Sequence, residues 1–152
     1  MNPDAPRLRR LDPNDDAVAA LVISIQRRAY RLEADLIGFD GIPGLQENIV
    51  DLQRRHDLIW LGSHERERLV GVMAWTIDGK DCDIDRLAVD PNFHRRGHAR
   101  SLIGSLTGFD RITVSTGAAN LPAIRLYESL GFHIVGPEQR DGVTIVHLER
   151  IE

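Results

Sequence analysis

The chain has 152 residues, of which 42% are apolar and 28% charged, and its formal net charge is -4. This length fits a single domain over residues 1–152, and because the sequence has neither an apolar run of membrane-span length nor a signal-peptide core, we expect a cytoplasmic protein that binds no membrane. The acidic net charge argues against a nucleic-acid-binding protein, and the single cysteine, Cys82, excludes an intramolecular disulfide.

The N-terminal elements are predicted from turn residues and apolar periodicity. Residues 7–11 are typical of a strand, and Asp12 and Pro13 suit the cap and the first position of a following helix. Apolar residues recur every three or four positions over residues 18–36. This period predicts one long amphipathic helix, continuous or broken near Tyr30.

A loop, a second helix and a hairpin come next. The loop at residues 38–44 is rich in apolar side chains, which either line a ligand or fill the core. Residues 45–56 are predicted to form the helix. Residues 58–63 and 69–77 are predicted to be antiparallel strands around a polar turn. The second of these strands is apolar on both faces, which indicates a central position in the sheet.

The next strand begins at Cys82 and ends at Val89, and its apolar residues change parity on the way. Cys82 and Ile84 share one face of a regular strand, whereas Leu87 and Val89 share the other. One extra residue near positions 85–86, a β-bulge, would bring all four side chains to the same face. The alternative is a strand that is buried on both faces and has no bulge.

A short basic loop follows Pro91 and leads to a helix with apolar residues from Ala99 onward. The first backbone N–H groups of a helix have no carbonyl partner and carry partial positive charge, so they suit an anion. Gly97 allows a ligand to approach the backbone, and Arg95 and Arg96 add positive charge. The pattern predicts either a phosphate or pyrophosphate site or an ordinary strand-to-helix turn with a solvated basic face.

The remaining elements complete a mixed α/β order. The helix after the basic loop is predicted to stop at Gly108, and a strand over residues 111–115 follows. A further helix is predicted between Asn120, its N-cap, and Gly131, at its C′ position. A final hairpin over residues 132–148 closes the chain. This order predicts an open sheet with helices on its faces.

Two stretches of the sequence carry a family resemblance, between residues 87 and 132. The first is the basic loop, which has Gly97 and Ala99 two positions apart and His94 three positions before the glycine. The second is the helix that contains Asn120, Ala123, Leu126, Tyr127, Glu128, Gly131 and Phe132. Together they resemble the GNAT superfamily of acetyl-CoA-dependent N-acetyltransferases, whose patterns are Gln/Arg-x-x-Gly-x-Gly/Ala and Asn-x-x-Ala-x-x-Leu-Tyr-Glu-x-x-Gly-Phe. The departure is His94, which stands in place of Gln or Arg.

The resemblance implies a fold and a cofactor. The implied fold is α/β, with a mixed, mostly antiparallel sheet of six to seven strands that is flanked by about four helices and splayed between the fourth and fifth strands. The implied cofactor is acetyl-CoA, with its pyrophosphate in the basic loop and its pantetheine arm on the strand backbone beside the bulge. The predicted cofactor-binding residues are Leu87, Ala88, Val89, His94, Arg95, Arg96, Gly97, His98, Ala99, Arg100, Asn120, Ala123 and Tyr127.

The resemblance also implies catalytic roles. Tyr127 is expected to donate a proton to the departing thiolate, and the backbone N–H of Val89 or its neighbour to stabilise the oxyanion. The alternative for Tyr127 is a packed side chain with its hydroxyl in water. Some family members place a glutamate base on the strand before the Asn-containing helix, where this sequence has Ser115 or a neighbour. The predicted catalytic residues are Tyr127, Glu33 and Asp85, with Asp83 as a further candidate base.

The expected reaction is direct transfer of an acetyl group to a primary amine of a small molecule or peptide in a ternary complex. The carboxylates expected to attract a cationic amine are Glu33, Asp35, Asp40, Asp83 and Asp85. The alternative function is a non-catalytic acyl-CoA-binding module. His94 and His98 have the spacing of a metal-binding pair, but no third ligand is apparent and no metal is predicted. A monomer or a homodimer is expected, without a nucleic-acid partner.

Overall fold

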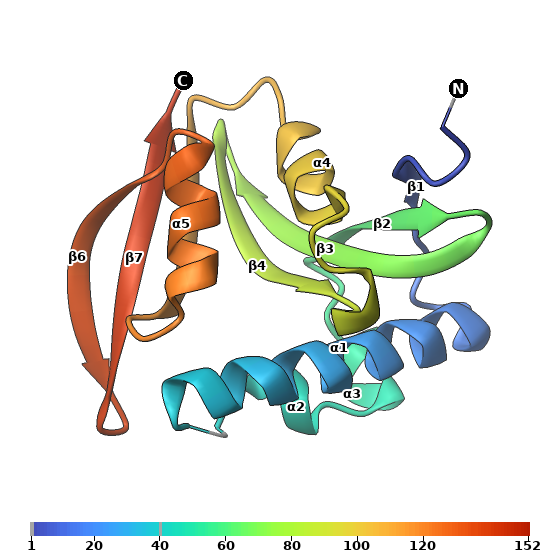
Figure 1. Cartoon of the computed structure of the whole chain (residues 1–152), viewed down its shortest axis with the longest axis horizontal. Helices are drawn as coiled ribbons and strands as arrows, with labels where there is room; N and C mark the ends of the chain where they lie inside the picture. Colours follow the sequence, from blue (N-terminus) through green and yellow to red (C-terminus); the bar gives the residue numbers. More distant parts are fainter. Residues whose placement is uncertain (1, 40) are drawn as a thin grey trace.

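The chain folds around one seven-stranded sheet (Figure 1). The computed structural model describes residues 2–39 and 41–152. The strands are β1 (Arg7–Arg10), β2 (Ile59–Glu65), β3 (Arg68–Asp78), β4 (Asp81–Val89), β5 (Arg111–Gly117), β6 (His133–Arg140) and β7 (Val143–Ile151), in the order β1-β2-β3-β4-β5-β7-β6. Neighbouring strands are antiparallel except β4 and β5, which are parallel. The sheet confirms the predicted mixed, mostly antiparallel fold.

Helices pack on both faces of the sheet, and two clusters of buried side chains form the core. The helices are α1 (Asp16–Ile37), α2 (Pro43–Gln46), α3 (Ile49–Gln53), the 3-10 helix η1 (Pro91–Phe93), α4 (His98–Gly104) and α5 (Leu121–Ser129). One cluster joins the sheet to α4 and α5 and includes Met73 and Leu102. The other joins the sheet to α1 and includes Val22 and Val72. Because Met73 and Val72 are adjacent on β3, this strand is buried on both faces, as predicted for a central strand.

The strands β4 and β5 run side by side only at their beginning. Their parallel pairing joins Asp81–Asp83 to residues 111–113, and within the described chain it ends there. Beyond that point β4 turns away from β5, and α1 runs below the end of β4 (Figure 1). This divergence confirms the predicted splay between the fourth and fifth strands.

The predicted β-bulge is also confirmed. Ile84 pairs with Trp75 of β3 and Arg86 pairs with Ala74, so Asp85 is the extra residue. As a result Ile84 and Leu87 contribute to the same buried cluster, on the side of α4 and α5.

The long helix α1 is continuous through Tyr30, but its predicted start is wrong. Asp15 is the N-cap, because its side chain accepts hydrogen bonds from the N–H groups of Ala17 and Val18. Asp12 instead accepts from the N–H of Asn14, in the turn before the helix. Within residues 2–39 and 41–152, no helix combines the length and apolarity needed to cross a bilayer.

The single second helix predicted over residues 45–56 is likewise wrong, because two short helices, α2 and α3, occupy this region. Asn48 interrupts the helix in an extended conformation and caps α3. Its side chain accepts from the N–H of Asp51, and the Asp51 carboxylate accepts from the N–H of Asn48. This reciprocal capping box starts a new helix where apolar spacing alone indicates a continuous one.

Candidate active site

The chain turns sharply between β4 and α4. Arg95 and Gly97 have φ angles of 62° and 85°, in the left-handed region that glycine adopts readily and other residues rarely. Gly97 is the N-cap of α4, and within the described chain no side chain caps this helix. The first N–H groups of α4 therefore lie beside a basic loop, and no side chain of the described residues accepts a capping hydrogen bond from them. This geometry suits the predicted pyrophosphate, whose binding here stays a prediction.

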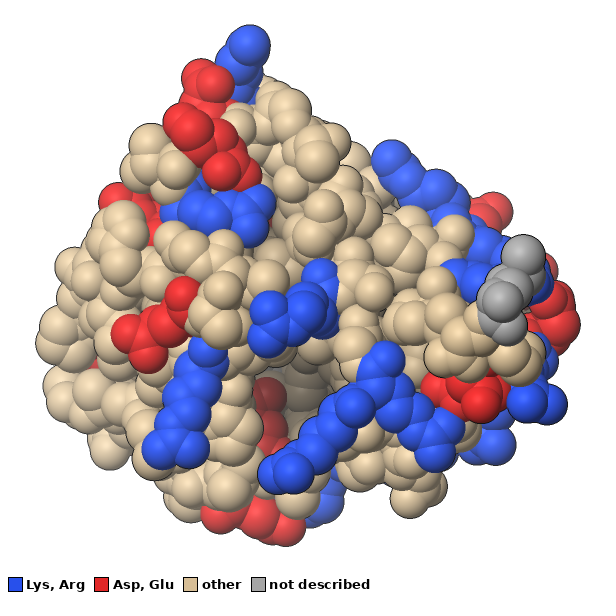
Figure 2. Space-filling view, turned by 45° about the horizontal axis from the view of Figure 1, so that its top comes forward, with Lys and Arg blue, Asp and Glu red and all other residues tan. Residues whose placement is uncertain are grey.

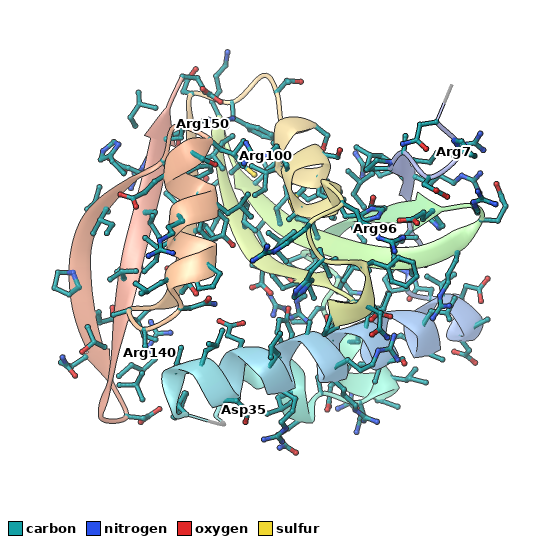
Figure 3. All side chains as sticks on the ribbon, viewed as in Figure 1. Arg7, Asp35, Arg96, Arg100, Arg140 and Arg150 are labelled. Atoms are coloured by element: carbon teal, nitrogen blue, oxygen red, sulfur yellow. The ribbon has the colours of Figure 1, made fainter. Side chains whose placement is uncertain are left out.

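Basic side chains surround a hollow on this side of the molecule, and acidic atoms are visible inside it (Figure 2). His94 and Arg95 of the loop are exposed. Arg100 lies between α4 and α5 in Figure 3, and its guanidinium donates to Ser129 Oγ at 3.0 Å. Arg96 donates to a carboxylate of β2 and stacks on a loop aromatic ring, 5.1 Å from the ring centroid. Arg95 and Arg100 are thus placed to meet an anion.

A buried polar chain lies directly behind the loop. The imidazole of His98 is 1% exposed, its Nδ1 lies 2.7 Å from Ser63 Oγ, and its Nε2 donates to Glu65 Oε2 at 2.9 Å. Arg96 donates to the other oxygen of Glu65. These bonds from His98 and Arg96 hold the pKa of Glu65 below its usual range. The His98 side chain is therefore a core group, and only its backbone N–H is free to serve the predicted cofactor contact.

Replacing Ser63 by Ala is expected to lower the free energy of unfolding by about 1–3 kcal/mol, because a buried ring nitrogen of His98 loses its partner. Urea denaturation followed by circular dichroism measures the change. Ser101→Ala, at a half-buried position of α4, is the matched control and is expected to unfold like the unsubstituted protein. Equal midpoints for both variants would show that the buried chain does not stabilise the loop.

His94 and His98 do not form a metal pair, since one is exposed and the other is held in the core. Among the described residues, no three His, Cys, Asp or Glu side chains are grouped closely enough to hold a metal ion.

The backbone of β4 has an open edge in the splay. The N–H of Asp90 donates to the carbonyl of Val70 at 2.8 Å, so this pair belongs to the hydrogen-bonded set of the antiparallel β3–β4 ladder. In such a ladder the intervening residues direct their N–H and C=O groups to the opposite edge. Leu87 and Val89 hold those positions, facing the side from which β5 has diverged. Among the residues that the structure describes, the predicted pantetheine partners therefore face no strand partner on this edge.

Residues from three elements meet in the splay. Asn120, the N-cap of α5, donates to Thr116 Oγ1 at 3.3 Å, and the Thr116 hydroxyl donates to Glu33 Oε1 of α1 at 3.4 Å. Tyr127 of α5 is 5% exposed and packs on Phe132 with ring centroids 5.7 Å apart. Asn120, Glu33 and Tyr127, which are far apart in the sequence, thus form one cluster.

Burial controls the acid–base properties of this cluster. It raises the pKa of the Tyr127 phenol, and the nearby charge of Glu33 raises it further. Burial also raises the pKa of Glu33, against the opposing effect of hydrogen bonds from Asn120 and Thr116. Tyr127 is therefore protonated at neutral pH and can donate a hydrogen bond, and Glu33 is a better proton acceptor than an exposed carboxylate.

The other predicted carboxylates are distributed differently. Asp85 accepts from Arg55 at 3.3 Å and from Arg86 at 2.9 Å, so two guanidinium groups occupy its oxygens. Asp83 accepts from a threonine hydroxyl of β5 at 2.5 Å. Asp35 is exposed on the side of α1 away from the sheet in Figure 3. Asp40 lies outside the described residues. Among these carboxylates, Glu33 is the one that belongs to the cluster of Tyr127, and the attraction of a cationic amine by the others stays a prediction.

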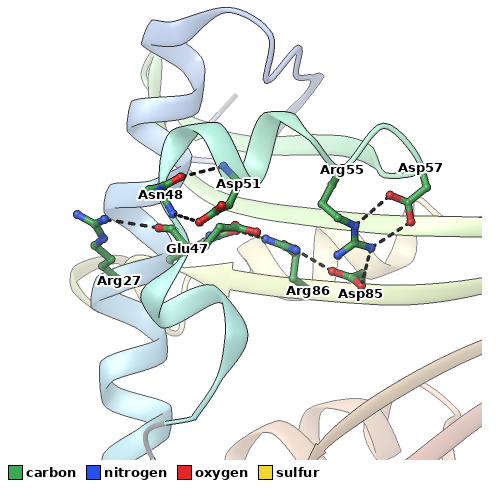
Figure 4. A network of polar contacts seen from close by, with 9 residues as sticks. Arg27, Glu47, Asn48, Asp51, Arg55, Asp57, Asp85 and Arg86 are labelled. Carbon is green, nitrogen blue, oxygen red and sulfur yellow. Dashed lines mark hydrogen bonds and ion pairs between the residues drawn. The ribbon is translucent and has the colours of Figure 1, made fainter.

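A network of charged side chains, which the sequence did not predict, links β4 to α1 and to the segment between α2 and α3 (Figure 4). Arg86, whose side chain is 7% exposed, donates to Glu47 Oε1 at 2.6 Å and to Gln26 Oε1 at 3.2 Å. Its guanidinium also stacks on the Trp60 ring at 5.3 Å. The bulge is the signal that could have found this residue, since a bulge at Asp85 turns Arg86 toward α1.

Comparisons with known proteins agree with this geometry. Residues 22–132 match the model of the "Acetyltransferase (GNAT) family". Over 126 residues the chain is 33% identical to the UPF0157 protein YqkA of Bacillus subtilis, a match that covers 80% of this chain and 36% of that protein. The chain therefore spans about a third of the length of this curated relative.

Solved structures share the fold. The ribosomal-protein-S18-alanine N-acetyltransferase of Escherichia coli superposes with a TM-score of 0.76 at 18% identity, over 96% of this chain and 93% of that one. The PaiA N-acetyltransferase of Thermoplasma acidophilum, solved in complex with coenzyme A, has a TM-score of 0.72 at 18% identity, over 97% and 99%. YncA of Salmonella typhimurium, solved with acetyl-CoA, has a TM-score of 0.69 at 17% identity, over 97% and 94%.

Proposed function

This chain belongs to the GNAT acetyltransferase family, and from that membership we propose that it transfers the acetyl group of acetyl-CoA to a primary amine. The acceptor is an amine of a small molecule or peptide, and transfer is direct, in a ternary complex. The observation that carries the proposal is the convergence of three features on the splay. These are the basic loop, with left-handed φ angles at Arg95 and Gly97, the open edge of β4 and the buried phenol of Tyr127.

In the proposed complex the cofactor follows β4. Its pyrophosphate lies at the loop from His94 to Ala99 and at the first N–H groups of α4, with Arg95 and Arg100 as charged partners. Its pantetheine arm pairs with the peptide groups of Leu87 and Val89. The divergence of β5 after residue 113 supports this path, because it leaves the β4 edge without a strand partner. Acetyl-CoA supplies the activated acetyl thioester.

The proposed reaction forms a C–N bond and breaks a C–S bond. The amine nitrogen attacks the thioester carbon, and the N–H of Val89 or its neighbour stabilises the oxyanion. Tyr127 donates to the departing sulfur. The amine must first be neutral, and for an alkylamine with a pKa near 10.4 this costs about 4.6 kcal/mol at pH 7. A base is therefore needed, and Glu33 and Asp85 stay the bases predicted from the sequence, although ion pairs already engage Asp85.

Calorimetric titration with acetyl-CoA and coenzyme A tests the cofactor site. Gly97→Glu is expected to weaken binding roughly 100-fold, because like charges about 4 Å apart repel by about 4 kcal/mol at an effective dielectric of 20, less the screening by salt. Gly97→Ala is the matched control. It places the same Cβ at a positive φ, and the space around that Cβ is open, but it adds no charge.

Each outcome of this titration has a clear meaning. Binding lost in Gly97→Glu and retained in Gly97→Ala supports a pyrophosphate at the loop. Equal affinities for all three proteins would contradict this placement. No binding by the unsubstituted protein would overturn the proposed activity. Binding without transfer to any amine would favour the alternative, a non-catalytic acyl-CoA-binding module.

A further inference from the structure

A second hollow lies on the sheet face that α5 does not cover. Its volume is about 550 Å³, within the range of small-molecule pockets. It is lined by residues that include Asp83 of β4, Thr113 and Ser115 of β5, Pro137 and Glu138 of β6, and His147 of β7. It therefore reaches from the point where β4 and β5 part to the C-terminal hairpin.

Three of the lining side chains form a continuous hydrogen-bonded chain. Ser115 Oγ lies 2.6 Å from His147 Nδ1, and His147 Nε2 lies 3.3 Å from Glu138 Oε1. Arg140 and His147 hold the pKa of Glu138 below its usual range, so this carboxylate is ionised and can only accept. In the neutral imidazole, Nε2 of His147 then carries the proton and donates to Glu138, Nδ1 accepts, and the Ser115 hydroxyl donates to Nδ1. A serine hydroxyl in this arrangement can pass its proton to histidine when it receives another.

Ser115 occupies a special position relative to the reacting atoms. It lies two residues beyond Thr113, where the pairing of β5 with β4 ends, and so it belongs to the part of β5 that has left β4. Successive residues of a strand point to opposite faces. Thr116 points to Glu33, and Val114 packs in the cluster that contains Tyr127. Ser115 therefore occupies the other side of β5 from the thiolate donor Tyr127 and its neighbour Glu33.

We propose that the hollow admits the acceptor amine and that Ser115 and His147 take up its proton. The inference rests on the proposed acetyl transfer. An acid for the sulfur and a base for the amine must contact different atoms, and opposite faces of β5 provide two separate positions.

The proton balance of the step is complete. As the amine nitrogen bonds to the thioester carbon, its proton passes to Ser115 Oγ, and the proton of Ser115 passes to His147 Nδ1. The C–S electron pair leaves with sulfur, which receives a proton from Tyr127. Glu138 accepts from Nε2 of the resulting imidazolium and is a positioning residue. The proton on His147 is then released to solvent, from which Tyr127 is reprotonated.

The charged groups around His147 come from each neighbouring strand. They are Asp83 of β4, Arg111 of β5, Glu138 and Arg140 of β6, and Glu149 of β7, which pairs with Arg111. Proton uptake by Nδ1 requires a neutral His147, so the proposed step is blocked once the imidazole is protonated. The rate should therefore fall on the acidic side of the pH–rate profile, its acidic limb.

The test compares five variants, Ser115→Ala, Ser115→Thr, His147→Gln, His133→Gln and Glu33→Gln, in steady-state kinetics from pH 5 to 9. The acceptor is the best amine found by screening amino acids, polyamines, aminoglycosides and peptides. Ser115→Ala and His147→Gln are each expected to lower kcat about 100-fold with unchanged affinity for acetyl-CoA. In His147→Gln the pH–rate profile is also expected to lose its acidic limb. Ser115→Thr, which keeps a hydroxyl, is expected to retain most of the activity. His133→Gln, an exposed histidine of β6 outside the hollow, is the matched control.

Two results would overturn the inference. One is unchanged kcat and an unchanged acidic limb in both Ser115→Ala and His147→Gln. The other is loss of that limb in Glu33→Gln with its retention in His147→Gln, which would assign the base to Glu33. If the unsubstituted protein binds acetyl-CoA but acetylates no amine, the proposed function itself fails, and the inference with it. Ser115 and His147 lie on an open face, so misfolding of their variants is readily excluded by thermal melts.

Discussion

Tyr127→Phe is expected to lower kcat by about 10²–10⁴-fold, the usual contribution of a positioned proton donor. The phenol is buried, and its pKa is raised by burial and by the charge of Glu33, so it is fully protonated at neutral pH. Complete proton transfer from a phenol to a thiolate is uphill, by roughly 2 kcal/mol even with ordinary pKa values. The effect is therefore expected from loss of a hydrogen bond that strengthens as charge develops on sulfur.

The fold of this variant should be intact. Phe keeps the ring that packs on Phe132, and only the hydroxyl is lost. Acetyl-CoA affinity, measured by calorimetry, is expected to stay unchanged while thiol release in the presence of amine falls. Tyr30→Phe is the matched control, since Tyr30 is a second buried phenol whose pKa is raised by burial. Full turnover in Tyr127→Phe, or its loss in Tyr30→Phe alone, would contradict the assignment.

Arg86→Leu is expected to lower the free energy of unfolding by about 3–5 kcal/mol, because it leaves buried acceptors without their cation. Glu47, with a side chain 10% exposed, would lose its 2.6 Å ion pair, and Gln26, fully buried, would lose a donor. At about 2–4 °C for each kcal/mol, the melting temperature should fall by roughly 6–20 °C. The link between β4 and the segment joining α2 to α3 would be broken as well.

Paired substitutions separate the charge from the packing. The double variant Arg86→Leu/Glu47→Leu is expected to recover most of the lost stability, because removing both partners leaves no unpaired buried charge. Arg86→Lys should recover little, since an ammonium cannot contact Glu47, Asp85 and Gln26 with the geometry of a guanidinium. Thermal denaturation of the four proteins provides the comparison. If Arg86→Leu proved as stable as the unsubstituted chain, the network of Arg86 would not stabilise the fold.

The family and most of the fold could be predicted from sequence signals alone. Local signals were enough for the bulge at Asp85, which a change of parity revealed, and for the start of α5 at Asn120 and its end before Gly131. Each of these features depends on residues a few positions apart, within the reach of strand alternation and helix capping. Three errors of helix placement are also local. At Asp12 and Asn48 a competing cap sets the helix start, and α4 ends at Gly104, before the predicted stop at Gly108.

Which polar side chains share a site depends on how the elements pack together in three dimensions. His98 and Arg96 are adjacent to the phosphate loop in sequence, yet contacts with β2 draw the first into the core and pair the second with Glu65. Ser115 meets His147 through the pairing of β5 with β7, about thirty residues away. A buried polar group must find a partner wherever the fold provides one, and that partner is set by strand register. Periodicity along the chain carries no such information, because it describes each element before the elements have been brought together.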